Sequence, residues 1–287
     1  MQPVKLSKWE ELFSKNPMMA EVTRFRKRFL SIRGSSVAVN GGIGIVLVLY
    51  ALFAIICVYY RGDMEPILLI GFFVGIMLFA IPLLLHGSIS GERERRSWDM
   101  LMVAPITHGQ IIVGKFMGAF AGLSMAFGLY LIPVLIDAAF NADSRFINVF
   151  LAILVVVAQA SSIIAMTLLI SARVKRPLIA LAVSIAVVMI YFILIPSMIG
   201  SVRMITTQFL NGILSPFDVL FRLSRNVNIN PDEFDRYNDQ PLDAITMSLS
   251  QILYQFFLTI CMLIWATKTL AYADNEVKFV SKKKRHA

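Results

Sequence analysis

The chain has 287 residues, of which 57% are hydrophobic and 16% charged, with a formal net charge of +9 and a mean hydropathy of +0.73. A soluble globular domain carries about 25% charged residues, so this composition excludes an ordinary soluble protein and indicates a membrane protein. A nucleic-acid partner is also excluded, because the chain has no soluble basic domain.

Residues 1–38 are expected to form a cytoplasmic segment with one amphipathic helix. Asn16 and Pro17 are typical of a helix start, and Gly34 of a helix end. Apolar side chains at helical spacing would let this helix lie in the membrane surface among anionic head groups. The alternative is a basic anchor beside the first span. The basic and aromatic residues concerned are Arg24, Phe25, Arg26, Lys27, Arg28 and Phe29.

Long apolar runs predict six membrane-spanning helices in a transmembrane domain, 39–268. Each contains about 20 or more consecutive residues without Asp, Glu, Lys or Arg, enough to cross the hydrocarbon core as a helix. The predicted spans are 39–60, 66–86, 111–137, 146–171, 178–201 and 244–267.

The distribution of basic residues predicts the orientation of these spans. With both termini in the cytoplasm, 21 of the 27 Lys and Arg residues lie on the cytoplasmic side, the basic tail 269–287 included. Basic residues favour that side of a membrane. Residues 1–38 contain no cleavable signal peptide, and no Asn-x-Ser/Thr acceptor occurs, which fits the inner membrane of a bacterium. Cys57 and Cys261 lie inside predicted spans and imply no disulfide framework.

The cytoplasmic loop 87–110 is expected to contain a short rigid helix between spans two and three. Its cap, its apolar face and its terminating proline suggest a surface that docks on a soluble partner. The alternative is a loop that packs only within this chain. The residues that define the helix are Ser97, Trp98, Asp99, Leu101, Met102 and Pro105.

The stretch 109–116, GQIIVGKF, resembles a phosphate-binding loop in its spacing of Gly109, Gly114 and Lys115. That loop requires a Ser or Thr after the lysine and a turn between a strand and a helix, whereas Phe116 follows here. We therefore interpret the stretch as the entrance of span three. A capping box of Thr107 and Gln110 would begin the helix, and Lys115 would extend into the head groups.

Span three carries a glycine at every fourth position. Such a stripe lets two helix backbones approach closely in a membrane. Its partner is either a neighbouring helix of this chain or a second subunit. The residues are Gly114, Gly118 and Gly122.

The connection 200–243 divides into two parts. The first is apolar and interrupted at Ser215 and Pro216, so it predicts short helices at the outer membrane surface, against the alternative of a simple loop. The second part is acidic and rich in turn residues, without the spacing of a calcium loop.

Neither catalytic nor metal chemistry is indicated. The three histidines are isolated, and no metal or nucleophile motif occurs. The span interiors contain no ionisable residue, which disfavours a proton- or ion-driven transporter. Buried glutamines at positions 159, 251 and 255 are expected to hold helices together rather than contact substrate.

The loop and the start of span three together resemble the signature of type-2 ABC transporter permeases. That signature has an acidic-basic-acidic start, a Leu-rich short helix, a proline followed by a small apolar residue, and Gly-Lys opening the next span. Arg96-Ser97 departs from the usual Gly-Thr but keeps a capping hydroxyl. The matching residues are Glu92, Arg93, Glu94, Leu101, Pro105, Ile106, Gly114 and Lys115.

This resemblance implies an all-α membrane protein with six transmembrane helices, an in-plane helix, a cytoplasmic coupling helix and short outer helices before the last span. The chain would be a permease subunit with no cofactor of its own and no catalytic residue. It would pair with an identical or different second permease and with ABC ATPase subunits, which bind ATP and magnesium. Export across the cytoplasmic membrane is the expected activity. A secondary transporter or channel without ATP is the alternative.

Overall fold

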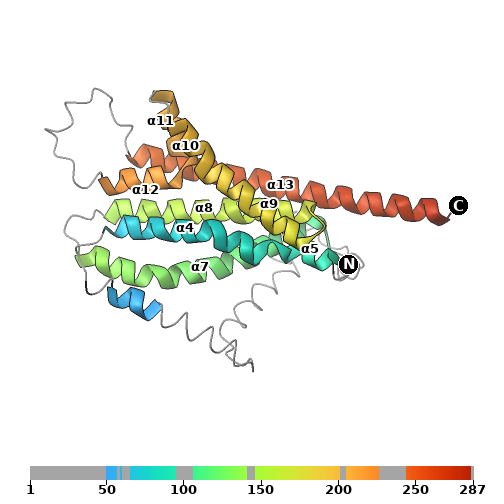
Figure 1. Cartoon of the computed structure of the whole chain (residues 1–287), viewed down its shortest axis with the longest axis horizontal. Coiled ribbons are helices and arrows are strands. Elements are labelled where there is room, and N and C mark those ends of the chain that lie inside the picture. Colours follow the sequence, from blue (N-terminus) through green and yellow to red (C-terminus); the bar gives the residue numbers. More distant parts are fainter. Residues whose placement is uncertain are drawn as a thin grey trace, which may run out of the picture.

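The structure is a computed structural model that describes residues 50–56, 59, 65–94, 106–140, 146–200, 205–225 and 244–285. All regular structure within these residues is helical, which confirms the expected all-α class (Figure 1). The labelled elements are α4 (Pro66–Leu85), α5 (Gly87–Glu94), α7 (His108–Phe140), α8 (Phe146–Arg173), α9 (Pro177–Met189), the π-helix η2 (Ile190–Leu194), α10 (Ile195–Gly200), α11 (Ile205–Leu214), α12 (Pro216–Arg225) and α13 (Ala244–Arg285).

Five helical segments in the described residues are long and apolar enough to cross a membrane. They overlap predicted spans two to six. Predicted span one, 39–60, lies largely outside the described residues, as does the in-plane helix that contains Arg24 to Phe29. The five candidate spans are Pro66–Glu94, His108–Phe140, Phe146–Arg173, Pro177–Ile199 and Ala244–Tyr272.

Two of these helices extend five or more residues beyond their predicted ends. Span two was expected to end at residue 86, but only a turn at His86 separates α4 from α5, and the helical path continues to Glu94. The last span was expected to end at 267, but α13 continues to Arg285 and projects past the other helices at the end of the bundle where α5 lies (Figure 1). Charged residues end an apolar run without ending a helix, since Lys, Arg and Glu all favour helical backbone.

Helix α8 forms the centre of the bundle. Of its most apolar stretch, 78% is buried, against 17% to 44% for the other four candidate spans. It contacts α4, α7, α9 and α13. Small buried residues such as Ala152, Ala158 and Ala165 line it. In a membrane, close packing of this kind replaces the hydrophobic force that joins helices in water.

Within the described residues between α10 and α13 lie two short helices, α11 and α12. The sequence predicted short helices here, and their position at the outer membrane surface stays a prediction. Ser215 separates α11 from α12, and its Oγ accepts a hydrogen bond of 3.3 Å from the backbone N–H of Asp218. Buried Val219, Leu220 and Leu223 pack α12 onto the bundle. The acidic stretch that follows lies outside the described residues.

Candidate functional site

The candidate site lies where α4 turns into α5, α7 begins and α8 ends, which we call the α5 end of the bundle (Figure 1). The backbone carbonyl of His86, in the turn before α5, accepts hydrogen bonds from Ser90 Oγ and from Ser171 Oγ, both at 2.7 Å. Ser90 is one turn farther along the same helical path, whereas Ser171 belongs to the last turn of α8. The start of α5 is therefore attached to α8.

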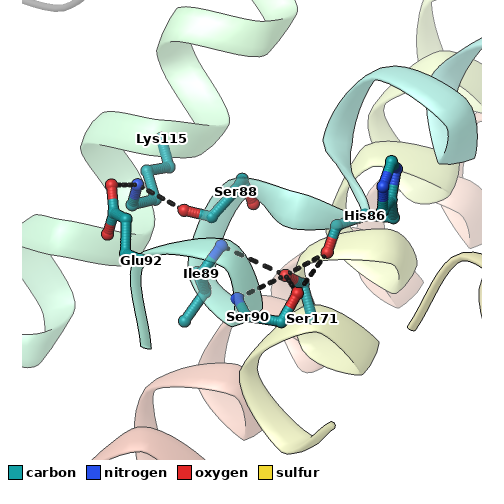
Figure 2. Close-up of polar contacts among 7 residues, drawn as sticks. All are labelled: His86, Ser88, Ile89, Ser90, Glu92, Lys115 and Ser171. Atoms are coloured by element: carbon teal, nitrogen blue, oxygen red, sulfur yellow. Dashed lines mark hydrogen bonds and ion pairs between the residues drawn. The ribbon is translucent and has the colours of Figure 1, made fainter. Parts of the chain in front are cut away.

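Ser171 uses the full hydrogen-bonding capacity of its hydroxyl. Besides donating to His86, its Oγ accepts from the backbone N–H groups of Ile89, at 3.1 Å, and Ser90, at 3.2 Å (Figure 2). The first N–H groups of a helix have no partner within that helix. Ser171 is itself fully buried. It therefore caps α5 from a different helix, at a place where water cannot supply the missing hydrogen-bond acceptor.

Replacing Ser171 with Ala is expected to lower the free energy of unfolding by about 1–3 kcal/mol, because buried N–H groups lose their acceptor. The measurement is thermal unfolding of the purified full-length chain. Ser88→Ala is the matched control, since Ser88 Oγ is buried without a hydrogen-bond partner and its loss removes no bond. Equal effects of the two substitutions would contradict the capping role of Ser171.

A partly buried ion pair joins α5 to the first turns of α7. Lys115 Nζ lies 2.6 Å from Glu92 Oε1 and 2.7 Å from the carbonyl oxygen of Ser88. The Lys115 side chain is 6% exposed and that of Glu92 30%. The expectation that Lys115 extends into the head groups is therefore wrong. An ammonium group enclosed by helices requires a carboxylate, and α5 places one beside it (Figure 2).

Arg93, next to Glu92 in sequence, attaches α5 to α8. One of its terminal guanidinium nitrogens donates a 2.7 Å hydrogen bond to the carbonyl oxygen of Ala172. Carbonyl groups in the last turn of a helix lack partners within that helix and attract cations. Glu94, by contrast, is exposed. Of the three charged residues that begin the loop, two are turned into the bundle.

The capping box predicted at the start of span three is confirmed. The backbone N–H of Thr107 donates to Gln110 Oε1 at 2.8 Å, and that of Gln110 donates to Thr107 Oγ1 at 3.3 Å. Residues 109–116 lie wholly within α7. A phosphate-binding loop needs a turn at this position, so the stretch is a helix entrance, as expected.

The remaining predicted site residues divide into two groups. The short-helix residues Ser97 to Pro105 lie outside the described residues, and their role stays a prediction.

On α7, Gly114 and Gly118 are buried, yet a Cβ built at Gly118 would meet nothing within 4 Å. No described helix therefore packs tightly against Gly118. Whether the glycine stripe of Gly114, Gly118 and Gly122 packs against a helix of this chain or of a second subunit stays a prediction. Within the described residues, no three His, Cys, Asp or Glu side chains group as metal ligands.

The sequence did not reveal that Glu92 and Lys115 are partners or that Ser171 belongs to the site. The sequence did contain a weak signal for the ion pair, because Glu92 and Lys115 have opposite charges and flank the same loop. Ser171 gave none, since a serine near the end of an apolar span is unremarkable.

Comparison with known families gives a match over most of the chain. The model of a family described as "ABC-2 family transporter protein" matches residues 45–279, a range that includes the whole site. No curated protein matches the chain.

Proposed function

Because the chain belongs to the ABC-2 family of transporter proteins, we propose that it is the permease subunit of an ATP-driven exporter in the cytoplasmic membrane. ATP and magnesium are bound by separate ABC ATPase subunits. A second permease, identical or different, completes the membrane part, and the α5 end faces the cytoplasm.

The observation that carries this proposal is the way α5 is attached to two other helices. Residues 95–105 lie outside the described residues and connect Glu94, the last residue of α5, with Ile106, two residues before α7 begins. Glu92 joins α5 to Lys115 of α7, and Arg93 with Ser171 joins α5 to α8. A force on the loop therefore reaches α7 and the central helix α8 directly.

This attachment suits a subunit that receives mechanical work from a partner. In the proposed cycle, ATP closes the ATPase pair, the short helix around Trp98 moves with it, and the spans reorient toward the outside. Glu92, Arg93 and Lys115 act as positioning residues that hold the base of the loop, and the predicted in-plane helix that contains residues 24–29 lies beside the ATPase.

The alternative of a secondary transporter or channel would need an ion or proton site in the spans, which ionisable residues within the membrane normally mark. Among the described residues, Asp137 is a fully buried acid, but it lies in the last turn of α7. The other buried charge is that of Lys115, at the opposite end of α7 from Asp137. It is neutralised by Glu92 of α5. Neither position suits a relay that crosses the membrane, so ATP-driven transport is favoured.

Purification tests the proposed function. An affinity-tagged chain extracted gently from its host membrane is expected to bring an ABC ATPase with it, and the isolated chain is expected neither to bind a fluorescent ATP analogue nor to hydrolyse ATP. Saturable nucleotide binding by the isolated chain, or substrate flux in vesicles that contain this chain and no ATPase, would contradict the proposal.

A further inference from the structure

A second cluster of polar side chains lies halfway along the bundle, between α8 and α13, far from the α5 end. We call it the polar layer and define it as Gln159 and Ser162 on α8 with Gln251 and Gln255 on α13. All four residues are at most 1% exposed. Since a hydrocarbon environment offers no water to a polar group, each of these side chains needs a partner from within the protein.

Most of the amide groups in the polar layer have no such partner. Ser162 Oγ donates a 2.7 Å hydrogen bond to Gln255 Oε1, which links the two helices. Among the residues that the structure describes, Gln255 Nε2 and both amide atoms of Gln159 and Gln251 have no hydrogen-bond partner. The sequence predicted that the glutamines hold helices together, and of the three only Gln255 makes such a bond.

The two unpartnered glutamines lie at one level of the bundle. Helices α8 and α13 run in the same direction (Figure 1), and the Ser162–Gln255 bond fixes their register. Gln159 precedes Ser162 by three residues, and Gln251 precedes Gln255 by four. Both steps are about one helical turn along the same face, so Gln159 and Gln251 lie at a similar level of the bundle in that register.

The helix beside this layer is irregular at the same depth. Tyr191 lies in the π-helix η2, and its hydroxyl contacts that of Tyr254, the neighbour of Gln255 in sequence. A π-turn inside an α-helix is rare and commonly marks a functional position. The polar layer therefore adjoins a point where the α9–α10 path departs from regular helix.

We propose that α8 and α13 separate at the polar layer during the transport cycle, and that Gln159 and Gln251 then hydrogen-bond to an uncharged polar part of the cargo. The proposal rests on the proposed function. Each amide offers both donors and an acceptor, and the polar layer contains no charged side chain, so hydroxyl or amide groups are the class of ligand that it fits.

The unpartnered amides also give a reason for the separation. A buried polar group without a hydrogen bond disfavours the packed arrangement, and contact with water or cargo would remove that penalty. Helix α13 is suited to transmit the movement, because one continuous helix joins the polar layer to Arg285 beyond the α5 end. A displacement at that end reaches Gln251 and Gln255 without crossing a loop.

Thiol labelling in the complete transporter tests the separation. Gln159→Cys and Gln251→Cys are made singly in a chain with Cys57→Ser and Cys261→Ser, and the complex in nanodiscs is treated with a charged methanethiosulfonate reagent, with and without ATP, magnesium and vanadate. We expect labelling about tenfold faster in one of the two conditions, as for a site exposed in one conformation only.

Two positions serve as controls for this labelling. Leu253→Cys lies on the outer face of α13, where Leu253 is 71% exposed, and is expected to react slowly in both conditions because lipid covers it. Thr107→Cys, exposed before α7, is expected to react fast in both. The proposal would be overturned if both test positions reacted as slowly as Leu253→Cys in a complex that vanadate inhibits. The polar layer would then be interpreted as a site that only encloses water.

A stability measurement that needs no ATPase separates this inference from the proposed function. In the full-length chain in nanodiscs, Gln159→Leu and Gln251→Leu are expected to leave the unfolding midpoint unchanged or to raise it, because no hydrogen bond is lost. Gln255→Leu is expected to lower it, because Ser162 loses its acceptor on α13. Equal losses for all three would overturn the inference, whereas failure of an ATPase to co-purify would refute only the proposed function.

Discussion

Replacing Trp98 or Leu101 with Asp is expected to abolish coupling to the ATPase without preventing membrane insertion. In the proposed function these side chains form the apolar face of the short helix that enters a cleft of the ATPase. Burying a carboxylate there would remove a central apolar contact, and such contacts are worth about 2–4 kcal/mol in protein interfaces. The expected result is loss of the co-purifying ATPase at wild-type levels of chain in the membrane fraction.

The control for this experiment is Trp98→Phe, which keeps an apolar ring and is expected to retain most of the bound ATPase. Wild-type ATPase recovery and transport in both Asp variants would count against a docking role for the loop. The short helix would then be interpreted as a loop that packs only within this chain.

The second large effect is expected from breaking the ion pair between Glu92 and Lys115. Glu92→Gln removes the negative charge beside the enclosed Lys115 ammonium and leaves it with neutral acceptors, the Ser88 carbonyl among them. Loss of one partner of a buried pair costs about 3–5 kcal/mol, and the 30% exposure of Glu92 places the expected loss at about 2–3 kcal/mol. Chemical or thermal unfolding of the purified chain measures it.

The pair Asp218–Arg222 provides a matched comparison within the same chain. These side chains are 22% and 27% exposed and lie one turn apart on α12, at 2.9 Å. Pairs of this kind contribute about 0.2–0.5 kcal/mol, so Arg222→Met is expected to change stability little. The double variant Glu92→Gln with Lys115→Met should lose less than the two single variants combined, because it leaves no buried charge. A loss for Glu92→Gln no larger than that for Arg222→Met would show that the pair does not hold the loop.

Loosening this pair should also affect function. If Glu92 and Lys115 hold the base of the loop, Glu92→Gln is expected to retain the bound ATPase but to reduce ATP-driven transport, because the movement of the loop reaches α7 incompletely. This separates the positioning residues from Trp98 and Leu101, whose replacement removes the ATPase itself.

The sequence by itself determined the features that depend on near neighbours along the chain. Apolar runs placed the five described spans, Thr107 and Gln110 predicted the capping box, and Ser215 with Pro216 predicted the break between α11 and α12. Each of these signals lies within a few residues of the structure that it predicts, because caps, breaks and helical hydrogen bonds form over one turn. Family membership followed from the same kind of local signal around the loop.

Tertiary structure decided which of these elements meet. Ser171 caps a helix that begins more than eighty residues earlier, and Lys115 finds Glu92 across a loop. Gln251 and Gln255 differ by one turn on the same helix, yet only Gln255 has a partner. Spacing along a helix cannot distinguish such residues, because a polar side chain in a membrane takes its partner from whichever helix packs against it, and packing is a property of the whole bundle.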